Sequence, residues 1–214
     1  MTTAGSRGAP LALPIYPVGD LGKPTLVDLA LPRPFERWHV APMEAAIGGW
    51  LSESPPRLEL ATLALVEIER RGNESLRARM RFARYGLEPI PWLPAAHAKV
   101  RETFTPAVLA SQKTGRLGAH VYVVLRGGYT ASSGFYGAYV GSTGRTVAAR
   151  IAEHRRGGRR AARGLPRHGI EPLWSLFDFI NPVPRTKAGR EEWETRLHEA
   201  LAPVVPRVTG DVAF

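Results

Sequence analysis

Residues 139–154 read YVGSTGRTVAARIAEH, and this stretch decides the fold that the sequence predicts. Tyr139 belongs to a run of aromatic and β-branched residues, which is typical of a β-strand. Two glycines break that strand, and Thr146 is a residue type that begins helices. We therefore expect a strand, a tight turn and a helix over residues 146–156, ended by Gly157.

Arg150 and His154 are four residues apart on this expected helix. Side chains at that spacing share a face, so both can converge on one phosphate group. An arginine fork pairs with phosphate oxygens and neutralises the charge that grows during phosphodiester hydrolysis. The two residues therefore mark a candidate catalytic helix, and the alternative is an exposed pair with no function.

The segment before this stretch predicts a β-hairpin. Residues 120–125 read HVYVVL and residues 135–140 read FYGAYV, and both runs are typical of strands. The turn-rich residues 127–134 separate them, and strands so close in sequence pair antiparallel. Tyr122 and Tyr139 are therefore expected on adjacent strands.

Three further elements are expected after the stretch. Residues 159–167 fit a short helix, and residues 173–180 fit a third strand closed by an Asn-Pro pair. Residues 187–201 fit a final helix that Pro203 stops. The order β-β-α-α-β-α predicts an α+β fold, with a small three-stranded antiparallel sheet flanked by helices.

The final helix carries four acids, Glu191, Glu192, Glu194 and Glu199. Its apolar residues define the stripe that faces the core: Trp193, Leu197, Ala200 and Leu201. Glu194 lies roughly 75° from the centre of that stripe, whereas the other three acids lie beyond about 120°. Glu194 is therefore the acid expected to face a cleft at the edge of the core, with Glu191 or Glu192 as the alternative if the helix register differs.

These segments resemble the GIY-YIG nuclease superfamily. Residues 121–123 (VYV) stand where that family has its GIY triplet, and residues 139–141 (YVG) stand for YIG, followed by the helix with Arg150 and His154. Residues 194–201 (ETRLHEAL) resemble the family's metal-binding glutamate helix. The resemblance covers about residues 119–201 and leaves the N-terminal half unassigned.

The resemblance implies a catalytic set of Tyr122, Tyr139, Arg150, His154 and Glu194. It implies one divalent ion, Mg²⁺ or Mn²⁺, held by Glu194, phosphate oxygens and water. One tyrosine helps to deprotonate the attacking water, and its pKa of ~10 requires a nearby cation, which Arg150 and the metal could supply. Tyr122 is the favoured base and Tyr139 positions phosphate or water, although the two roles could be exchanged. His154 is a candidate proton shuttle or phosphate contact.

Three features differ from the family's pattern. Val121 replaces the glycine of GIY. Tyr122 and Tyr139 are seventeen positions apart. That spacing implies a long hairpin loop, which either contacts DNA or is a floppy connection. Many family members carry an asparagine after the final helix, whereas residues 203–214 contain none, which weakens the case for metal or water positioning.

The charge distribution favours a polyanionic partner. The chain has a formal net charge of +10, and residues 113–214 hold 16 basic and 8 acidic residues, against 13 and 11 in residues 1–112. Six arginines fall within thirteen residues with no acid among them: Arg155, Arg156, Arg159, Arg160, Arg163 and Arg167. Such a cluster is typical of a surface that binds the phosphate backbone of DNA, and a solvated helix face is the alternative.

The N-terminal half divides into two expected parts. Residues 1–57 are rich in proline and predict an extended arm with one short helix near 42–51, whereas residues 58–113 predict a helical region. Helices are expected over 56–71, 74–85 and 95–103. This region would recognise the target or bind a partner, and residues 119–214 would form the nuclease domain.

Several classes of protein are excluded or disfavoured. The sequence has no apolar run long enough for a membrane span, no signal-peptide pattern at its start, and no cysteine for disulfides, thiolate metal sites or nucleophilic catalysis. A cytoplasmic location is the default expectation. A P-loop motif is also absent.

The sequence therefore predicts a metal-dependent endonuclease that hydrolyses DNA. One setting is restriction or defence, in which the N-terminal half would recognise the target. Two other settings stay open, an antibacterial toxin that pairs with an immunity protein and a structure-specific repair nuclease. A different class of function is a nucleic-acid-binding protein that does not cut. The sequence does not predict the oligomeric state.

Overall fold

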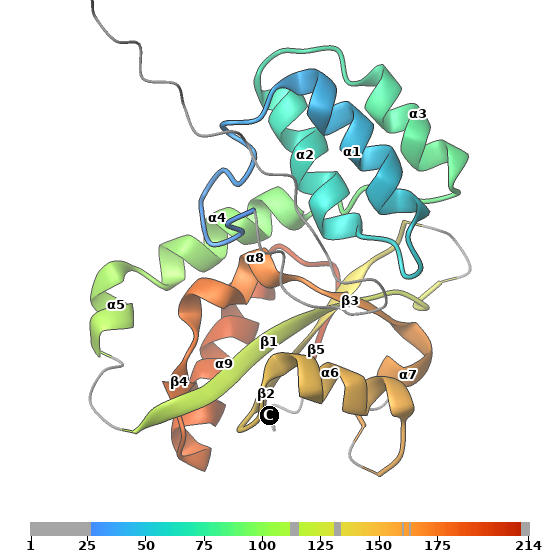
Figure 1. Ribbon diagram of the computed structural model, residues 1–214. Helices are drawn as coiled ribbons and strands as arrows, with labels where there is room; N and C mark the ends of the chain where they lie inside the picture. The colour runs from blue at the N-terminus through green and yellow to red at the C-terminus, as the bar shows by residue number, and fades with distance from the viewer. Residues whose placement is uncertain (1–26, 112–115, 131–133, 160, 163, 211–214) are drawn as a thin grey trace, which may run out of the picture.

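A computed structural model describes residues 27–111, 116–130, 134–159, 161–162 and 164–210 (Figure 1). In chain order its elements are α1 (Val40–Ser52), α2 (Leu58–Arg70), α3 (Leu76–Arg84), α4 (Leu93–Thr103), α5 (Pro106–Ser111), β1 (Leu117–Arg126), β2 (Gly137–Thr143), α6 (Val147–Arg156), α7 (Leu165–His168), β3 (Gly169–Pro172), α8 (Trp174–Phe177), the 3-10 turn η1 (Asp178–Ile180), β4 (Val183–Pro184), α9 (Lys187–Leu201) and β5 (Val208–Gly210). The predicted α+β class is confirmed for the described residues.

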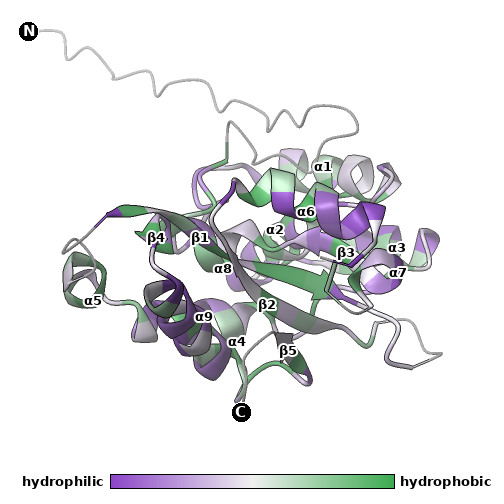
Figure 2. Ribbon diagram, turned by 90° about the horizontal axis from the view of Figure 1, so that it is seen from below, coloured by the Kyte–Doolittle hydropathy of each residue, from purple (hydrophilic) through white to green (hydrophobic). Residues whose placement is uncertain are grey.

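The expected hairpin forms the centre of the sheet. β1 and β2 pair antiparallel, with Tyr122 opposite Gly141 and Val124 opposite Tyr139. The strand order is β3-β1-β2-β5, and β4 also pairs with β1. Helix α6 lies on one side of this sheet and α9 on the other, as the view from below in Figure 2 shows.

Two predictions about the sheet are wrong. The sheet is mixed and not purely antiparallel, because β5 runs parallel to β2, with Ala138 opposite Val208. The strand predicted over residues 173–180 is also absent, since those residues form α8 and η1. The third strand of the predicted order is instead β3, which comes just before them.

The error over residues 173–180 has a physical cause. This run is almost continuously apolar, and such a run fits a buried helix as well as a buried strand. The structure buries most of it. The Glu59 carboxylate of α2 accepts hydrogen bonds from the backbone N–H groups of Trp174 and Ser175, which satisfies the first donors of α8. A distant residue therefore decides between the two conformations.

Most of the expected helices are present in the structure. The four helices predicted in the N-terminal half are present as α1 to α4, and α5 was not predicted. The helix predicted over residues 159–167 is wrong in extent, because α7 is the helix found among the described residues of that range and it begins at Leu165. Gly164 precedes α7 with a φ of 87°, a left-handed conformation that separates α7 from the preceding residues.

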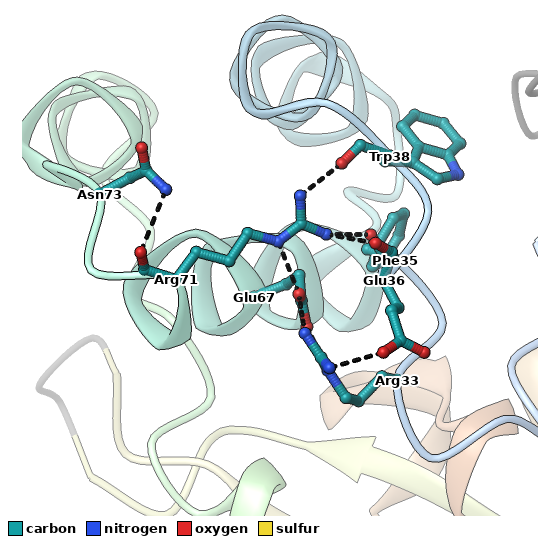
Figure 3. Close-up of polar contacts among 7 residues, drawn as sticks. All are labelled: Arg33, Phe35, Glu36, Trp38, Glu67, Arg71 and Asn73. Carbon is teal, nitrogen blue, oxygen red and sulfur yellow. Dashed lines mark hydrogen bonds and ion pairs between the residues drawn. The ribbon is translucent and has the colours of Figure 1, made fainter.

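The described part of the proline-rich segment packs against α2 and does not extend away from the fold. Phe35 and Trp38 are buried there. Arg71, at the end of α2, donates hydrogen bonds to the backbone oxygens of Phe35, Glu36 and Trp38 (Figure 3). Its guanidinium also pairs with Glu67, so a single side chain fixes this irregular segment to a helix.

The two halves of the chain share a buried boundary. Helix α4 lies beside α9 in Figure 1, and the rings of Phe104 and Trp193 pack there with centroids 5.5 Å apart. Trp92, at the start of α4, donates its indole N–H to the backbone oxygen of Tyr136 over 2.9 Å. The helical half therefore supports both the final helix and the strand hairpin.

Candidate active site

Tyr122 and Tyr139 lie on adjacent strands and face the same side of the sheet. Residues 122, 139 and 141 share a face because side chains alternate along each strand and Tyr122 is opposite Gly141. A Cβ atom at Gly141 would lie 2.6 Å from the Tyr122 hydroxyl oxygen and 2.9 Å from Cε1 of Tyr139. Glycine at this position therefore provides the space that both tyrosine rings occupy.

The Tyr122 hydroxyl is held by helix α6. Its oxygen lies 2.8 Å from Nε2 of His154, and Arg150 donates to it through Nε over 3.4 Å. A further hydrogen bond links Tyr122 to Tyr139. The rings of Tyr122, Tyr139 and His154 pack together, with centroids 5.8 to 6.2 Å apart. Arg150 and His154 thus share a helix face, as the sequence predicts.

The tautomer of His154 follows from its partners. The backbone N–H of Ala162 donates to Nδ1 of His154 over 3.0 Å. The neutral ring therefore carries its proton on Nε2, which donates to the Tyr122 oxygen. His154 is only 2 % exposed, so its position suits orientation of Tyr122 better than direct contact with a phosphate.

Burial raises the pKa of Tyr122 to about 12, because a phenolate at this position would lose its hydration. The hydrogen bond and charge of Arg150 lower the pKa, and the nearby charge of Glu194 raises it. With these groups alone, Tyr122 is a neutral phenol at neutral pH. The expected help from Arg150 is present, but burial outweighs it.

Glu194 is placed as the helical geometry predicts. It is 6 % exposed, whereas Glu191, Glu192 and Glu199 are exposed on the outer face of α9. The prediction that Glu194 alone lies at the core edge is confirmed. The charge of Glu194 also raises the pKa of Tyr122, so the two groups interact electrostatically. Tyr139, Arg150 and His154 contact Tyr122, and Glu194 acts on it through its charge.

An open cleft of about 410 Å³ lies beside this cluster. The end of β2 forms one wall, and the charged side chains that line it are Arg145, Arg150, Glu153 and Arg190. Glu153 accepts a hydrogen bond from Arg150 over 2.7 Å and lies 3.8 Å from Arg145. Three guanidinium groups against one carboxylate make the cleft suited to an anion such as a phosphodiester.

Sequence reasoning missed Arg145, Glu153 and Arg190. Arg190 had a usable signal, because it precedes Glu194 by one helical turn and so shares its face. Its guanidinium lies against Gly144, where an added Cβ atom would be 3.0 Å from Nη1. Glu153 had a similar signal, because it follows Arg150 by three residues on α6 and pairs with it. Arg145 had none, since it lies in the turn between β2 and α6.

The predicted arginine cluster is on the surface where the structure describes it. Arg155, Arg156, Arg159 and Arg167 are exposed on α6, α7 and the segment between them. Arg155 also donates to the backbone oxygen of Ile170 over 3.4 Å. Arg160 and Arg163 lie outside the described residues, so their predicted role stays a prediction.

Over the described ranges, no group of three or more His, Asp or Glu side chains gathers to hold a metal ion. Glu194 is buried and its charge acts on Tyr122, so it would serve as the one protein ligand of an ion that completes its shell with phosphate oxygens and water. That donor set is compatible with Mg²⁺ and would not suit an ion that requires several protein ligands.

The chain matches no protein-family model, no curated protein and no solved structure. Of the helices in the described ranges, none combines the length and the apolar character that crossing a bilayer requires. The fold and the site geometry therefore carry the functional inference by themselves.

Proposed function

We propose that the chain is an endonuclease of the GIY-YIG type that hydrolyses phosphodiester bonds in DNA. The observation that carries the proposal is the buried Tyr122 hydroxyl, which accepts hydrogen bonds from His154 and from Arg150, a residue that also lines an arginine-rich cleft. The hairpin with two tyrosines, the Arg-His helix and the glutamate helix support that family. The family resemblance predicts a three-stranded antiparallel sheet, and the parallel strand β5 is additional to it.

The cleft would bind the phosphate that is cut. Arg150 and Arg190 offer donors from two helices, so a phosphodiester group can be held from two directions. The same donors stabilise the additional negative charge of the transition state. Glu153 neutralises part of this charge in the absence of DNA, and the phosphate would compete with it for Arg150.

A divalent ion, Mg²⁺ or Mn²⁺, would be held by Glu194 together with phosphate oxygens and water. When bound, it would supply positive charge that lowers the pKa of nearby acids. The Tyr122 phenol requires such a cation to act as a base, because its pKa is about 12 without one. Tyr139 would position phosphate or water, and the assignment of the two tyrosines could be reversed.

The test measures nicking of supercoiled plasmid in the presence of Mg²⁺. It compares wild type with the variants Glu194→Gln and Tyr122→Phe. Both variants are expected to lose nearly all nicking, since each removes one reacting group and keeps the shape of the side chain. Glu191→Gln is the matched control, because Glu191 is exposed on the same helix and pairs with Lys187. Full nicking by Glu194→Gln would disprove the proposed metal site.

A second candidate function is nucleic-acid binding without cleavage. The complete burial of Tyr122 favours it, because a buried neutral phenol does not reach water by itself. Binding of DNA by wild type without nicking in Mg²⁺ or Mn²⁺ would select this function. For an active enzyme, nicking of modified, linear or branched DNA would distinguish restriction or defence, toxin and repair roles.

A further inference from the structure

A second, apolar groove lies at the opposite end of the strand hairpin from the cleft. Its volume is about 360 Å³, which lies within the range of ~300–1,000 Å³ typical of small-ligand sites. Its apolar walls come from both halves of the chain: Leu58, Leu87, Phe135, Tyr136 and Ile170. None of these residues belongs to the proposed catalytic cluster.

Phe135 gives this groove an exposed aromatic face. Its side chain is 41 % exposed, and it is one of five large apolar side chains that stand out on the described surface. Tyr129 packs edge-on against it, with ring centroids 6.2 Å apart. Tyr129 in turn lies under the guanidinium groups of Arg126 and Arg207, at 4.9 and 5.1 Å from its ring centroid. The aromatic face is therefore held in place by its neighbours.

Arginines from both halves are close to residues that line the groove, either in sequence or by hydrogen bonding. Arg84 is exposed at the end of α3, two residues before a lining glycine, and it makes no ion pair within the described residues. On the other side, Arg155 donates to the backbone of Ile170, and exposed Arg167 lies on the adjacent α7. The Glu88 side chain lies against Gly134 at the end of the hairpin, and its carboxylate would repel an anion there. We therefore expect phosphates beside Arg84 and Arg155 instead.

The groove and the cleft are joined by one helix. Arg145 and Arg150 line the cleft just before α6 and in its first turns, and Arg155, near its end, donates to the backbone oxygen of Ile170, which lines the groove. A helix of ten residues is about 15 Å long. That length equals roughly four nucleotides of a strand with a rise of ~3.4 Å. One nucleic-acid strand can therefore follow α6 from the cleft to the groove.

We propose that the groove binds an unpaired nucleobase of the DNA substrate, a few nucleotides from the bond that is cut. The base would stack on Phe135, and the phosphates on either side of it would contact Arg84 and Arg155. Stacking on an aromatic side chain and backbone contacts to arginine are the two components of single-strand recognition. This inference rests on the proposed nucleic-acid substrate, and it assigns that substrate to DNA with an unpaired or single-stranded segment.

The test uses the full chain without divalent metal and two oligonucleotides, a fully paired duplex and the same duplex with one bulged 2-aminopurine. Wild type is expected to bind the bulged duplex more tightly and to quench the 2-aminopurine fluorescence. Phe135→Ala should weaken binding of the bulged duplex roughly tenfold and abolish the quenching, with binding of the paired duplex unchanged. Leu31→Ala is the matched control, because Leu31 is 48 % exposed and lies outside the groove.

Equal affinity of wild type for the two duplexes would overturn the inference, as would equal weakening of both by Phe135→Ala. Circular dichroism of each variant checks that the fold is retained. Plasmid nicking by wild type, measured in parallel, separates the two proposals. Nicking without a preference for the bulge rejects the groove alone, and bulge binding without nicking rejects the nuclease activity alone.

Discussion

The Glu171 carboxylate of β3 accepts a hydrogen bond from the backbone N–H of Glu59, 112 residues earlier in the chain, over 2.7 Å. The Glu59 carboxylate in turn accepts from the backbone N–H groups of Trp174 and Ser175 and from the Ser175 hydroxyl, over 2.6 to 3.0 Å. Each glutamate thus satisfies donors at the start of a helix in the other half of the chain. Both carboxyl groups are buried, so neither half can form this boundary without the other.

Glu59 makes the stability of the fold dependent on pH. Burial raises its pKa to about 7, from a reference value of 4.5, and burial and the charge of Glu59 also raise the pKa of Glu171. A raised pKa in the folded state means that stability is fully present below 4.5 and is lost as the pH rises through about 7. The unfolding temperature should therefore fall between about pH 5 and about pH 8.

Glu59→Gln should flatten this fall, because the amide does not titrate, and should cost about 1–3 kcal/mol by disturbing a buried hydrogen bond. Thermal unfolding followed by circular dichroism at several pH values measures both effects. Glu69→Gln, on the exposed side of the same helix, should keep the pH dependence of wild type. An unchanged slope in Glu59→Gln would show that other groups cause the dependence.

His154 is predicted to act through Tyr122. His154→Ala should lower the rate of plasmid nicking on the order of 100-fold, because the phenol loses the donor that orients it. His154→Gln retains an N–H donor and should recover part of the rate. The initial nicking rate as a function of DNA concentration should show a lower kcat with little change in KM. A change confined to KM would instead place His154 in DNA binding.

Arg190 is predicted to bind the substrate phosphate. Arg190→Ala should raise the KM for DNA, because the cleft loses one of its three guanidinium groups. The slope of log affinity against log salt should fall by about 0.9, which corresponds to one phosphate contact. Arg196→Ala is the matched control, since Arg196 lies on the same helix, pairs with Glu192 and is absent from the cleft. Identical behaviour of the two variants would reject the role of Arg190.

Gly141 is predicted to be required for the geometry of the two tyrosines. Gly141→Ala should displace the Tyr122 and Tyr139 rings, cost about 1–3 kcal/mol in stability and abolish nicking. Chemical denaturation and the plasmid assay measure these effects. Gly49→Ala provides the comparison, because an added Cβ atom in that helix meets nothing within 4 Å and should stabilise by about 0.5–1 kcal/mol. If Gly141→Ala kept wild-type activity, a Cβ atom at this position would not displace the two tyrosine rings, and the prediction would be wrong.

The local elements around the candidate site could be predicted from the sequence. The β1–β2 hairpin, helix α6 with Arg150 and His154, and the placement of Glu194 at the core edge all follow from short-range patterns. Residues within a few positions of one another determine a helix periodicity, a strand alternation or a glycine turn, and these signals are present in the sequence itself.

The tertiary structure decided what depends on residues far apart in the chain. Residues 173–180 became helical because a carboxylate from α2 supplies acceptors to the first N–H groups of α8. The sheet became mixed because β5 returns after α9 to pair with β2. Arg190 of α9 and Glu153 of α6 line one cleft although their helices are far apart in the sequence. Such contacts form only when distant segments meet. Local patterns therefore determined the hairpin and most of the helices, whereas tertiary packing decided which of their residues share a surface.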